Sequence, residues 1–186
     1  MKATVLEEHG YDVALMGMSY SYMDNNENTD DWWPEQRTKA EKRSLLLAGK
    51  GGGHNKFLES IMVWVDIEAS RAFWQEMDTY RIGVTKQSTS TMHKLDKRRP
   101  VYEDFEEDTP DNVMDVFMSV WDTKPGLMVL KHSLPEGYLQ RRVVCLNYMS
   151  IRGIYHQRLR HRYYLWGQML EQLVSQLEHP ELITSS

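Results

Sequence analysis

The chain has 186 residues, of which 41% are hydrophobic and 26% are charged, and its formal net charge is −5 at pH 7. These values are typical of one soluble globular domain and argue against two full-sized domains. No apolar run is long enough to span a membrane, and the opening MKATVLEEHGYD lacks the apolar region of a signal peptide. The single cysteine, Cys145, excludes an internal disulfide and a cysteine-rich metal site. We therefore expect one cytoplasmic domain over residues 1–186, without a membrane partner.

The first quarter of the chain alternates strand and helix signals. TVLEEHG (4–10) predicts a strand that ends at a glycine turn, and the apolar segment 13–22 predicts a helix. A polar loop is expected over 24–37, because this stretch is rich in acidic and amide side chains and contains Pro34. Residues 39–49 are expected to form a helix that closes at a glycine.

The middle of the chain predicts a strand and two helices. IMVWVDI (61–67) is rich in β-branched and aromatic residues and predicts a buried strand, which runs into a helical pattern over 68–82. YEDFEEDTPD (102–111) is interpreted as a solvated acidic loop. A helix is expected next, with Thr109 as its N-cap and Pro110 in its first position. The apolar residues of that helix are Val113, Val116, Phe117, Val120 and Trp121.

The C-terminal segment has the clearest helical pattern and predicts one long helix over residues 151–173. Its apolar stripe consists of Ile151, Ile154, Tyr155, Leu165, Trp166, Met169 and Leu173. Arg158 and Arg162 fall inside this stripe, whereas Arg160 points the opposite way. An arginine on an apolar face requires a partner, which is either a carboxylate of the chain or an anionic or carbonyl-bearing ligand.

Positive charge is concentrated in one part of the sequence. Residues 131–162 hold seven basic side chains and one acid, Glu136, for a net charge of +6, so the rest of the chain carries −11. A local basic cluster in an acidic chain suits a small anionic ligand better than a nucleic acid, so no nucleic-acid partner is expected. A solvated basic face would explain the same charges.

Common catalytic and binding motifs are missing. AGKGGGH (48–54) has its lysine before the glycines and therefore cannot be a phosphate-binding P-loop. The chain has no G-x-G-x-x-G turn, no H-x-x-x-H pair and no G-x-S-x-G elbow. We expect no metal site, and the elements in order predict a single α+β domain.

Three segments, taken together, resemble the flavin-dependent thymidylate synthases. GHNKFLESIMVWVDIEASRA (53–72) is similar to the family's G-H-x-S-x-x-E-H entry into a strand and then a helix. DTYRIGVTKQSTSTMH (78–93) stands in the place of the flavin-binding R-H-R-x-x-S signature and the nucleotide loop beyond it. In the segment 131–158, L-P, N-x-x-S and a helical arginine fall without gaps on the family pattern.

The resemblance implies a role for each matched position. Arg158 matches the arginine that contacts and polarises the pyrimidine of dUMP, so it is the expected catalytic residue. The expected substrate-binding residues are Lys131, Lys86, Gln87, Ser88, Thr89 and Ser90. The expected cofactor-binding residues are His54, Thr79, Tyr80, Arg81 and Asn147. Of the R-H-R triplet only Arg81 is kept, because Thr79 and Tyr80 replace the first arginine and the histidine.

The family also implies a fold and a reaction. The fold is a single domain with a central, mostly antiparallel sheet, flanking helices and a long C-terminal helix. The reaction is reductive methylation of dUMP, or a related pyrimidine deoxynucleotide, with FAD, reduced nicotinamide and methylene-tetrahydrofolate. Members are homotetramers with active sites built between subunits. Because reduced flavin supplies the hydride, no protein nucleophile is required, and Cys145 is expected to be inert in an apolar helix.

Two other functions are compatible with the sequence. The altered R-H-R segment suits a non-catalytic nucleotide-binding homologue that acts as a sensor, an inhibitor or an accessory factor. Trp32 and Trp33 suit an interaction protein that uses exposed aromatic side chains, although such side chains also pack locally.

Overall fold

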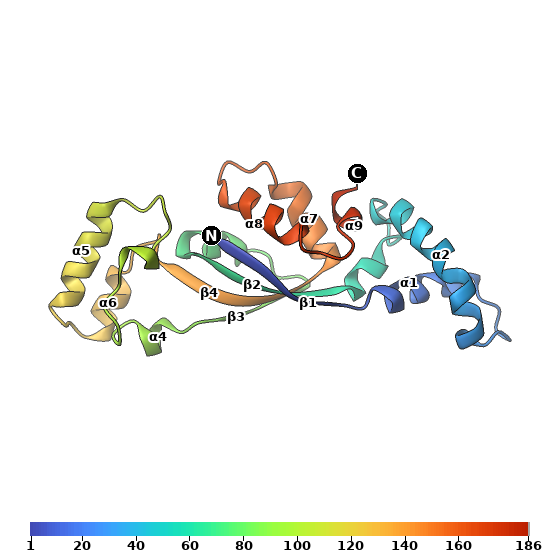
Figure 1. Ribbon diagram of the computed structural model, residues 1–186, viewed down its shortest axis with the longest axis horizontal. Coiled ribbons are helices and arrows are strands. Elements are labelled where there is room, and N and C mark those ends of the chain that lie inside the picture. Colours follow the sequence, from blue (N-terminus) through green and yellow to red (C-terminus); the bar gives the residue numbers. More distant parts are fainter. Residues whose placement is uncertain (186) are drawn as a thin grey trace.

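The computed structural model describes residues 1–185 as a four-stranded sheet with helices on one face and at both ends (Figure 1). The strands are β1 (Lys2–His9), β2 (Met62–Ser70), β3 (Val84–Ser88) and β4 (Leu139–Asn147). Their order is β1-β2-β4-β3, and each neighbouring pair is antiparallel. The expected α+β class with a central antiparallel sheet is thus confirmed.

The helices form three groups around this sheet (Figure 1). At one end lie α1 (Tyr11–Ser19), η1 (Tyr20–Tyr22), α2 (Thr29–Ala48) and η2 (Lys56–Ser60). One face of the sheet is covered by α3 (Arg71–Met77), α7 (Tyr148–Arg158), α8 (Leu165–Val174) and α9 (Glu181–Thr184). The opposite end holds α4 (Thr91–Lys94), η3 (Tyr102–Asp104), α5 (Asp111–Asp122) and α6 (Leu127–Ser133). Among the described residues, no helix is long and apolar enough to cross a membrane.

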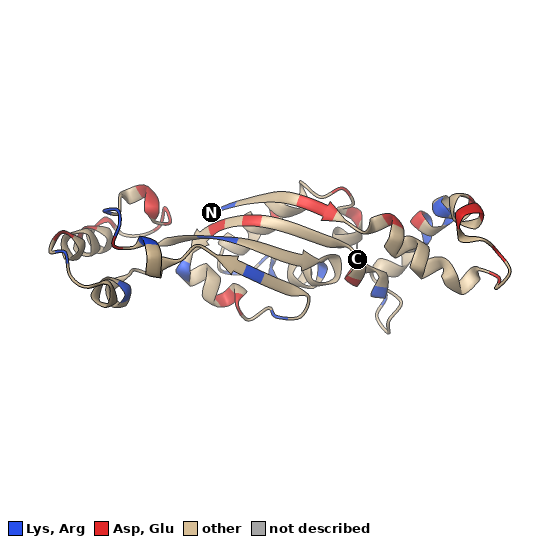
Figure 2. Cartoon of the chain, turned by 90° about the horizontal axis from the view of Figure 1, so that it is seen from below, with Lys and Arg blue, Asp and Glu red and all other residues tan. Residues whose placement is uncertain are grey.

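The main core lies between the sheet and the helices that cover it. Alternate side chains of the central strands are fully buried there, namely Val63, Val65, Ile67, Val144 and Leu146. Burying one such side chain contributes roughly 1.5–3 kcal/mol, so this alternation strongly fixes which face of the sheet turns inward. The other face, seen in Figure 2, carries half-buried and exposed side chains such as Trp64 and Val143.

A second, smaller core holds the α5–α6 end of the molecule together. Its buried members are Leu95, Phe105, Met114, Phe117, Met118, Leu130 and Leu134. Phe105 also pairs with Tyr138 in an isolated β-bridge. The acidic stretch 102–111 is therefore only partly solvated, contrary to expectation, because its aromatic residue anchors the second core.

The polar loop predicted over 24–37 is wrong from residue 29 onward, where α2 begins. The Asn28 side chain accepts a hydrogen bond from the Asp30 amide at 3.0 Å and so caps the helix N-terminus. Pro34 lies early in the helix, where its missing N–H removes a single intrahelical bond. Trp32 is buried, and this burial offsets that loss.

The predicted C-terminal helix is interrupted. α7 ends at Arg158 and α8 begins at Leu165, so the chain turns between them and both apolar faces pack onto the sheet. The periodicity was informative about burial, since Ile151 and Trp166 are both fully buried. Arg162 lies in the connection and is exposed, instead of facing the core as predicted.

Two further expectations need correction. Cys145 lies on β4 and not on a helix, because its neighbours Val144 and Leu146 are β-branched or apolar residues that pair with β2. The N-cap position of α5 is occupied by Pro110 and not by Thr109, and no side-chain hydrogen bond caps this end of the helix. The predicted apolar face of that helix is also partly wrong: Met114, Phe117 and Met118 are buried, whereas Val113 and Val116 are exposed.

The turn between β1 and α1 generates a stability prediction. Gly10 has φ +98°, and a Cβ there would overlap the carbonyl oxygen of Ser60. Gly10→Ala should therefore lower the free energy of unfolding by roughly 1–3 kcal/mol, measured by urea denaturation. Gly153→Ala on α7, where nothing lies within 4 Å of the added Cβ, should raise it by about 0.5–1 kcal/mol. Equal effects of the two substitutions would contradict this prediction.

Candidate functional site

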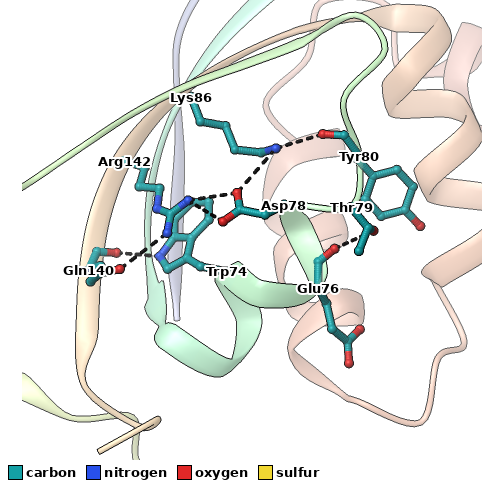
Figure 3. A network of polar contacts seen from close by, with 8 residues as sticks. All are labelled: Trp74, Glu76, Asp78, Thr79, Tyr80, Lys86, Gln140 and Arg142. Carbon is teal, nitrogen blue, oxygen red and sulfur yellow. Dashed lines mark hydrogen bonds and ion pairs between the residues drawn. The ribbon is translucent and has the colours of Figure 1, made fainter. Parts of the chain in front are cut away.

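A network of polar contacts joins the end of α3 to β3 and β4 (Figure 3). Asp78 lies at its centre and accepts a hydrogen bond from Arg142 Nη1 at 2.9 Å. Lys86 Nζ lies 3.6 Å from the same carboxylate and donates to the Tyr80 carbonyl oxygen at 2.8 Å. The Arg142 guanidinium stacks over the Trp74 ring at 4.3 Å. Two cations thus share one carboxylate beside the edge strand.

Burial disfavours the charged forms of the side chains in this network. The Lys86 side chain is largely buried, which lowers the pKa of its ammonium group, while the Asp78 charge opposes that shift. Arg142 Nε is buried without a hydrogen-bond partner among residues 1–185. An unsatisfied buried donor is costly, so this N–H is a local cost of packing the Arg142 guanidinium against Asp78 and the Trp74 ring.

Arg158 lies on the other side of the Tyr80 segment, at the end of α7. Its Nε donates to the Tyr80 hydroxyl at 2.8 Å, and its Nη1 lies 2.7 Å from His161 Nε2. Glu76 Oε2 is 3.6 Å from Nη1 and also accepts from Trp166 Nε1 at 2.7 Å. We expected this arginine to pair either with a carboxylate of the chain or with a ligand. The structure supplies a partner from the chain, because Glu76 lies within ion-pair distance.

The loop before β3 is fastened to the start of α7. Asn147 caps that helix, because its side-chain oxygen accepts from the Ser150 amide at 2.9 Å. Ser150 Oγ donates to the Ile82 carbonyl oxygen at 2.8 Å. Gly83 has φ +66° and packs so closely that an added Cβ would lie 2.6 Å from Asn147 Nδ2. The structure thus gives Asn147 a role in positioning the loop that carries Arg81, which is itself exposed.

The remaining residues expected to bind substrate lie along and beyond β3. Gln87, Ser88 and Thr89 are exposed, and Ser90 is partly buried. Ser88 pairs with Arg142 in the sheet register. The exposed side chains of Gln87, Ser88 and Thr89 leave their polar groups accessible to solvent.

Lys131 and His54 lie apart from this group in a single chain. Lys131 is on α6, at the end of the molecule that holds the second core, whereas His54 precedes η2 at the opposite end (Figure 1). Thr79, expected to bind cofactor, uses its hydroxyl to hydrogen-bond the Glu76 carbonyl oxygen at 2.7 Å. One chain therefore brings together the residues of 78–90 with Asn147 and Arg158, but not Lys131 or His54.

His54 lines a cavity of about 720 Å³ between α1, α2 and η2. Arg43 and Lys56 add positive charge to its wall, and Tyr22 and Phe57 add aromatic surface. The Arg43 guanidinium lies 3.8 Å from the Tyr22 ring centroid. Cationic donors beside aromatic rings suit a ligand that carries both an anionic group and a flat ring system. The residues present therefore fit part of a flavin nucleotide.

Sequence reasoning missed Arg142, Trp74 and Arg43 as members of these clusters. Arg142 belongs to the basic segment 131–162, but only the pairing of β4 with β3 places it beside Asp78. Arg43 lies in a charged helical stretch whose pattern did not distinguish it from its neighbours. Among residues 1–185, no group of three or more His, Cys, Asp or Glu side chains could hold a metal ion.

Comparison with known proteins supports the fold. No protein-family model matches the chain, and no curated protein matches it in sequence. Two similar solved structures are thymidylate synthase X and the flavin-dependent thymidylate synthase ThyX, both from Helicobacter pylori and both with FAD and dUMP. Each has a TM-score of 0.77 and 15% identity, over 99% of this chain and 98% of the other. The chain therefore has the fold of these flavin-dependent thymidylate synthases.

The Asp78 network generates a prediction about ionisation. Asp78→Asn should lower the pKa of Lys86 further, because the Asp78 charge is what opposes the effect of burial. The pKa can be measured by following the Lys86 side-chain carbon signals by NMR across alkaline pH. Asp31→Asn, in the first turn of α2, should leave that pKa unchanged. A rise of the Lys86 pKa in Asp78→Asn would contradict the contact.

Proposed function

We propose that this protein is a flavin-dependent thymidylate synthase-like enzyme, which methylates dUMP or a related pyrimidine deoxynucleotide with a folate one-carbon donor. The observation that carries the proposal is the position of Arg158. The chain shares the fold of enzymes solved with FAD and dUMP, and its α7 ends in an arginine whose Nε donates to the Tyr80 hydroxyl. Reduced nicotinamide and methylene-tetrahydrofolate are the proposed co-substrates.

The proposed role of Arg158 is electrostatic. Its guanidinium donates to the pyrimidine carbonyl and stabilises the negative charge that develops there, an effect typically worth a few kcal/mol. Nη2 has no hydrogen-bond partner among residues 1–185, so one donor remains available while Nε and Nη1 hold the side chain in place. Tyr80 and Glu76 thus act as positioning residues for this arginine.

The proposed binding of the nucleotide phosphate uses the edge of the sheet. Ser88, Thr89 and Ser90 offer hydroxyl groups, Gln87 offers an amide, and a lysine can donate an ammonium proton. Lys86 is held by Asp78 and Tyr80 in this structure, so its proposed contribution is the positive potential beside the phosphate. Lys131 is proposed to reach the nucleotide from another subunit.

The proposed FAD site draws on the cavity lined by His54. Arg43, Lys56 and His54 of one subunit would hold its anionic groups, together with Arg81 from the loop before β3 of another subunit. Thr79, Tyr80 and Asn147 shape that loop. Bound FAD, once reduced, supplies a hydride, and the chain's own residues bind, orient and polarise.

Binding is tested first by absorption spectroscopy and calorimetry. The purified protein should retain a flavin band through gel filtration, and dUMP should shift that band. Arg158→Ala should weaken dUMP binding by about tenfold or more, because a charge-assisted hydrogen bond contributes about 1.5–3 kcal/mol. Arg160→Ala, an exposed residue two positions further on, should bind dUMP normally.

A second variant separates binding from folding. Arg158→Lys keeps the positive charge and loses the forked donor, so it should stay folded by circular dichroism while dUMP binding falls. Unchanged dUMP affinity in folded Arg158→Lys and Arg158→Ala would overturn the proposed role. Formation of dTMP from dUMP, followed by chromatography, tests the reaction itself.

A second candidate function is a nucleotide-binding homologue without catalysis, acting as a sensor, an inhibitor or an accessory factor. The contacts of Arg158 with Tyr80, His161 and Glu76 favour it, because they occupy two of the donor groups that would face a substrate. A protein that binds dUMP but neither retains flavin nor forms dTMP would have this function.

We also propose a homotetramer with shared sites, since a single chain separates Lys131 and His54 from Arg158. Static light scattering of the purified protein should give a mass about four times 22.0 kDa. A chain of this size that binds dUMP as a monomer would contradict shared sites.

A further inference from the structure

His161 lies just beyond the end of α7, beside the arginine on which the proposed site depends. Its backbone amide donates to the Arg158 carbonyl oxygen at 3.0 Å, and this turn brings the His161 ring back toward the guanidinium. Nε2 of the half-buried ring lies 2.7 Å from Arg158 Nη1. Nδ1 lies 3.2 Å from the backbone nitrogen of Tyr163. Each ring nitrogen of His161 therefore faces an N–H group.

These two contacts cannot both be hydrogen bonds. Guanidinium and backbone N–H groups only donate, whereas a neutral imidazole has one nitrogen that accepts and one that carries a proton. The contact with Arg158 is shorter and involves a cation, so it is the stronger of the two. Nε2 is therefore the acceptor, and the proton of the neutral ring is on Nδ1. Free histidine more often carries its proton on Nε2, so the contact with Arg158 selects the less common form.

Protonation of His161 would abolish the contact. An imidazolium ring has no acceptor nitrogen, and its charge would lie against the Arg158 guanidinium. No carboxylate of residues 1–185 lies within ion-pair distance of the His161 ring to offset that repulsion. The other charged or titratable residues that contact this pair, or flank it in the chain, are Glu76, Tyr80, Arg160, Arg162 and Tyr163. Only Glu76 is negative, and its carboxylate lies on Arg158, so the contact requires a neutral His161.

The contact with His161 decides which part of the guanidinium is left for a ligand. Tyr80 holds Nε and His161 holds Nη1, while Nη2 has no hydrogen-bond partner among residues 1–185. We propose that His161, as the neutral Nδ1–H tautomer, is a positioning residue that directs Arg158 Nη2 toward the substrate, and that protonation of His161 releases the arginine. The expected effect on dUMP rests on the proposed function, whereas the tautomer does not.

The tautomer is tested by NMR on the full-length, ¹⁵N-labelled protein without nucleotide. At about pH 8, long-range ¹H–¹⁵N correlations should place the His161 proton on Nδ1, with the signals assigned by their loss in His161→Gln. The Arg158 Nε–H signal should stay sharp in His161→Gln, because a glutamine oxygen also accepts, and should broaden by exchange in His161→Ala. A proton on Nε2 would overturn the inference, whether or not the protein binds dUMP.

Calorimetry with dUMP tests the positioning role. At about pH 8, His161→Ala should weaken dUMP binding about fivefold, and His161→Gln should bind within about twofold of the parent. Between about pH 8 and about pH 5, the parent should lose about fivefold more affinity than His161→Gln, because only the parent has an acceptor that protonation removes. Protonation of dUMP itself affects both proteins equally and cancels in this comparison. His156→Gln, which replaces an exposed histidine of α7, is the matched control and should keep the parent's pH profile.

Unfolding midpoints followed by circular dichroism establish that the variants are folded. Equal dUMP affinity in folded His161→Gln and His161→Ala would overturn the positioning role, and identical pH profiles of the parent and His161→Gln would overturn the release by protonation. A parent protein that does not bind dUMP would contradict the proposed function alone. The NMR signals of His161 and Arg158 would then decide the inference by themselves.

Discussion

The pairing of β2 with β4 is the constraint on which the rest of the structure depends. The two strands pair over nine residues each, from Met62 opposite Asn147 to Ser70 opposite Leu139. One face of this pair is fully buried beneath α7 and α8 and the other is not, so a shift by one residue would turn the buried side chains outward. The same register places β3 beside β4 and the segment 78–83 beside α7, and thereby assembles the polar network.

The buried and half-buried arginines around this sheet each require hydrogen-bond partners. Arg152 is buried and donates to the carbonyl oxygens of Leu182 and Ile183, each at 3.0 Å. Arg142 uses Asp78 and the Trp74 ring, and Arg158 uses Tyr80. Much of the positive charge of residues 131–162 is therefore matched inside the chain. Fewer of these basic side chains are therefore accessible to a ligand than the net charge of the segment suggests.

Charge is also organised along the length of the molecule. The cavity between α1, α2 and η2 is lined by cationic and aromatic side chains, whereas the cavity between η3 and α5 is lined by carboxylates. The helices that line them lie at opposite ends of the sheet (Figure 1). The sheet thus separates a cavity with cationic side chains in its lining from one lined by carboxylates.

The sequence by itself determined the α+β class, the strand at 61–67 and the burial of residues such as Ile151 and Trp166, because these follow from local periodicity and composition. The tertiary structure decided where helices begin and stop. In the structure α2 begins at Thr29, earlier than predicted, and the predicted C-terminal helix ends at Arg158. Capping and packing outweigh local polarity in setting these ends.

The same division holds for the site. Motif resemblance indicated Arg158, Tyr80 and Arg81 from their order in the chain. Only the tertiary structure brings Arg158 to Tyr80, which lies 78 positions earlier in the chain. It likewise places Arg142 and Lys86 on the same carboxylate, that of Asp78. Long-range pairing sets such contacts, and no local pattern records it.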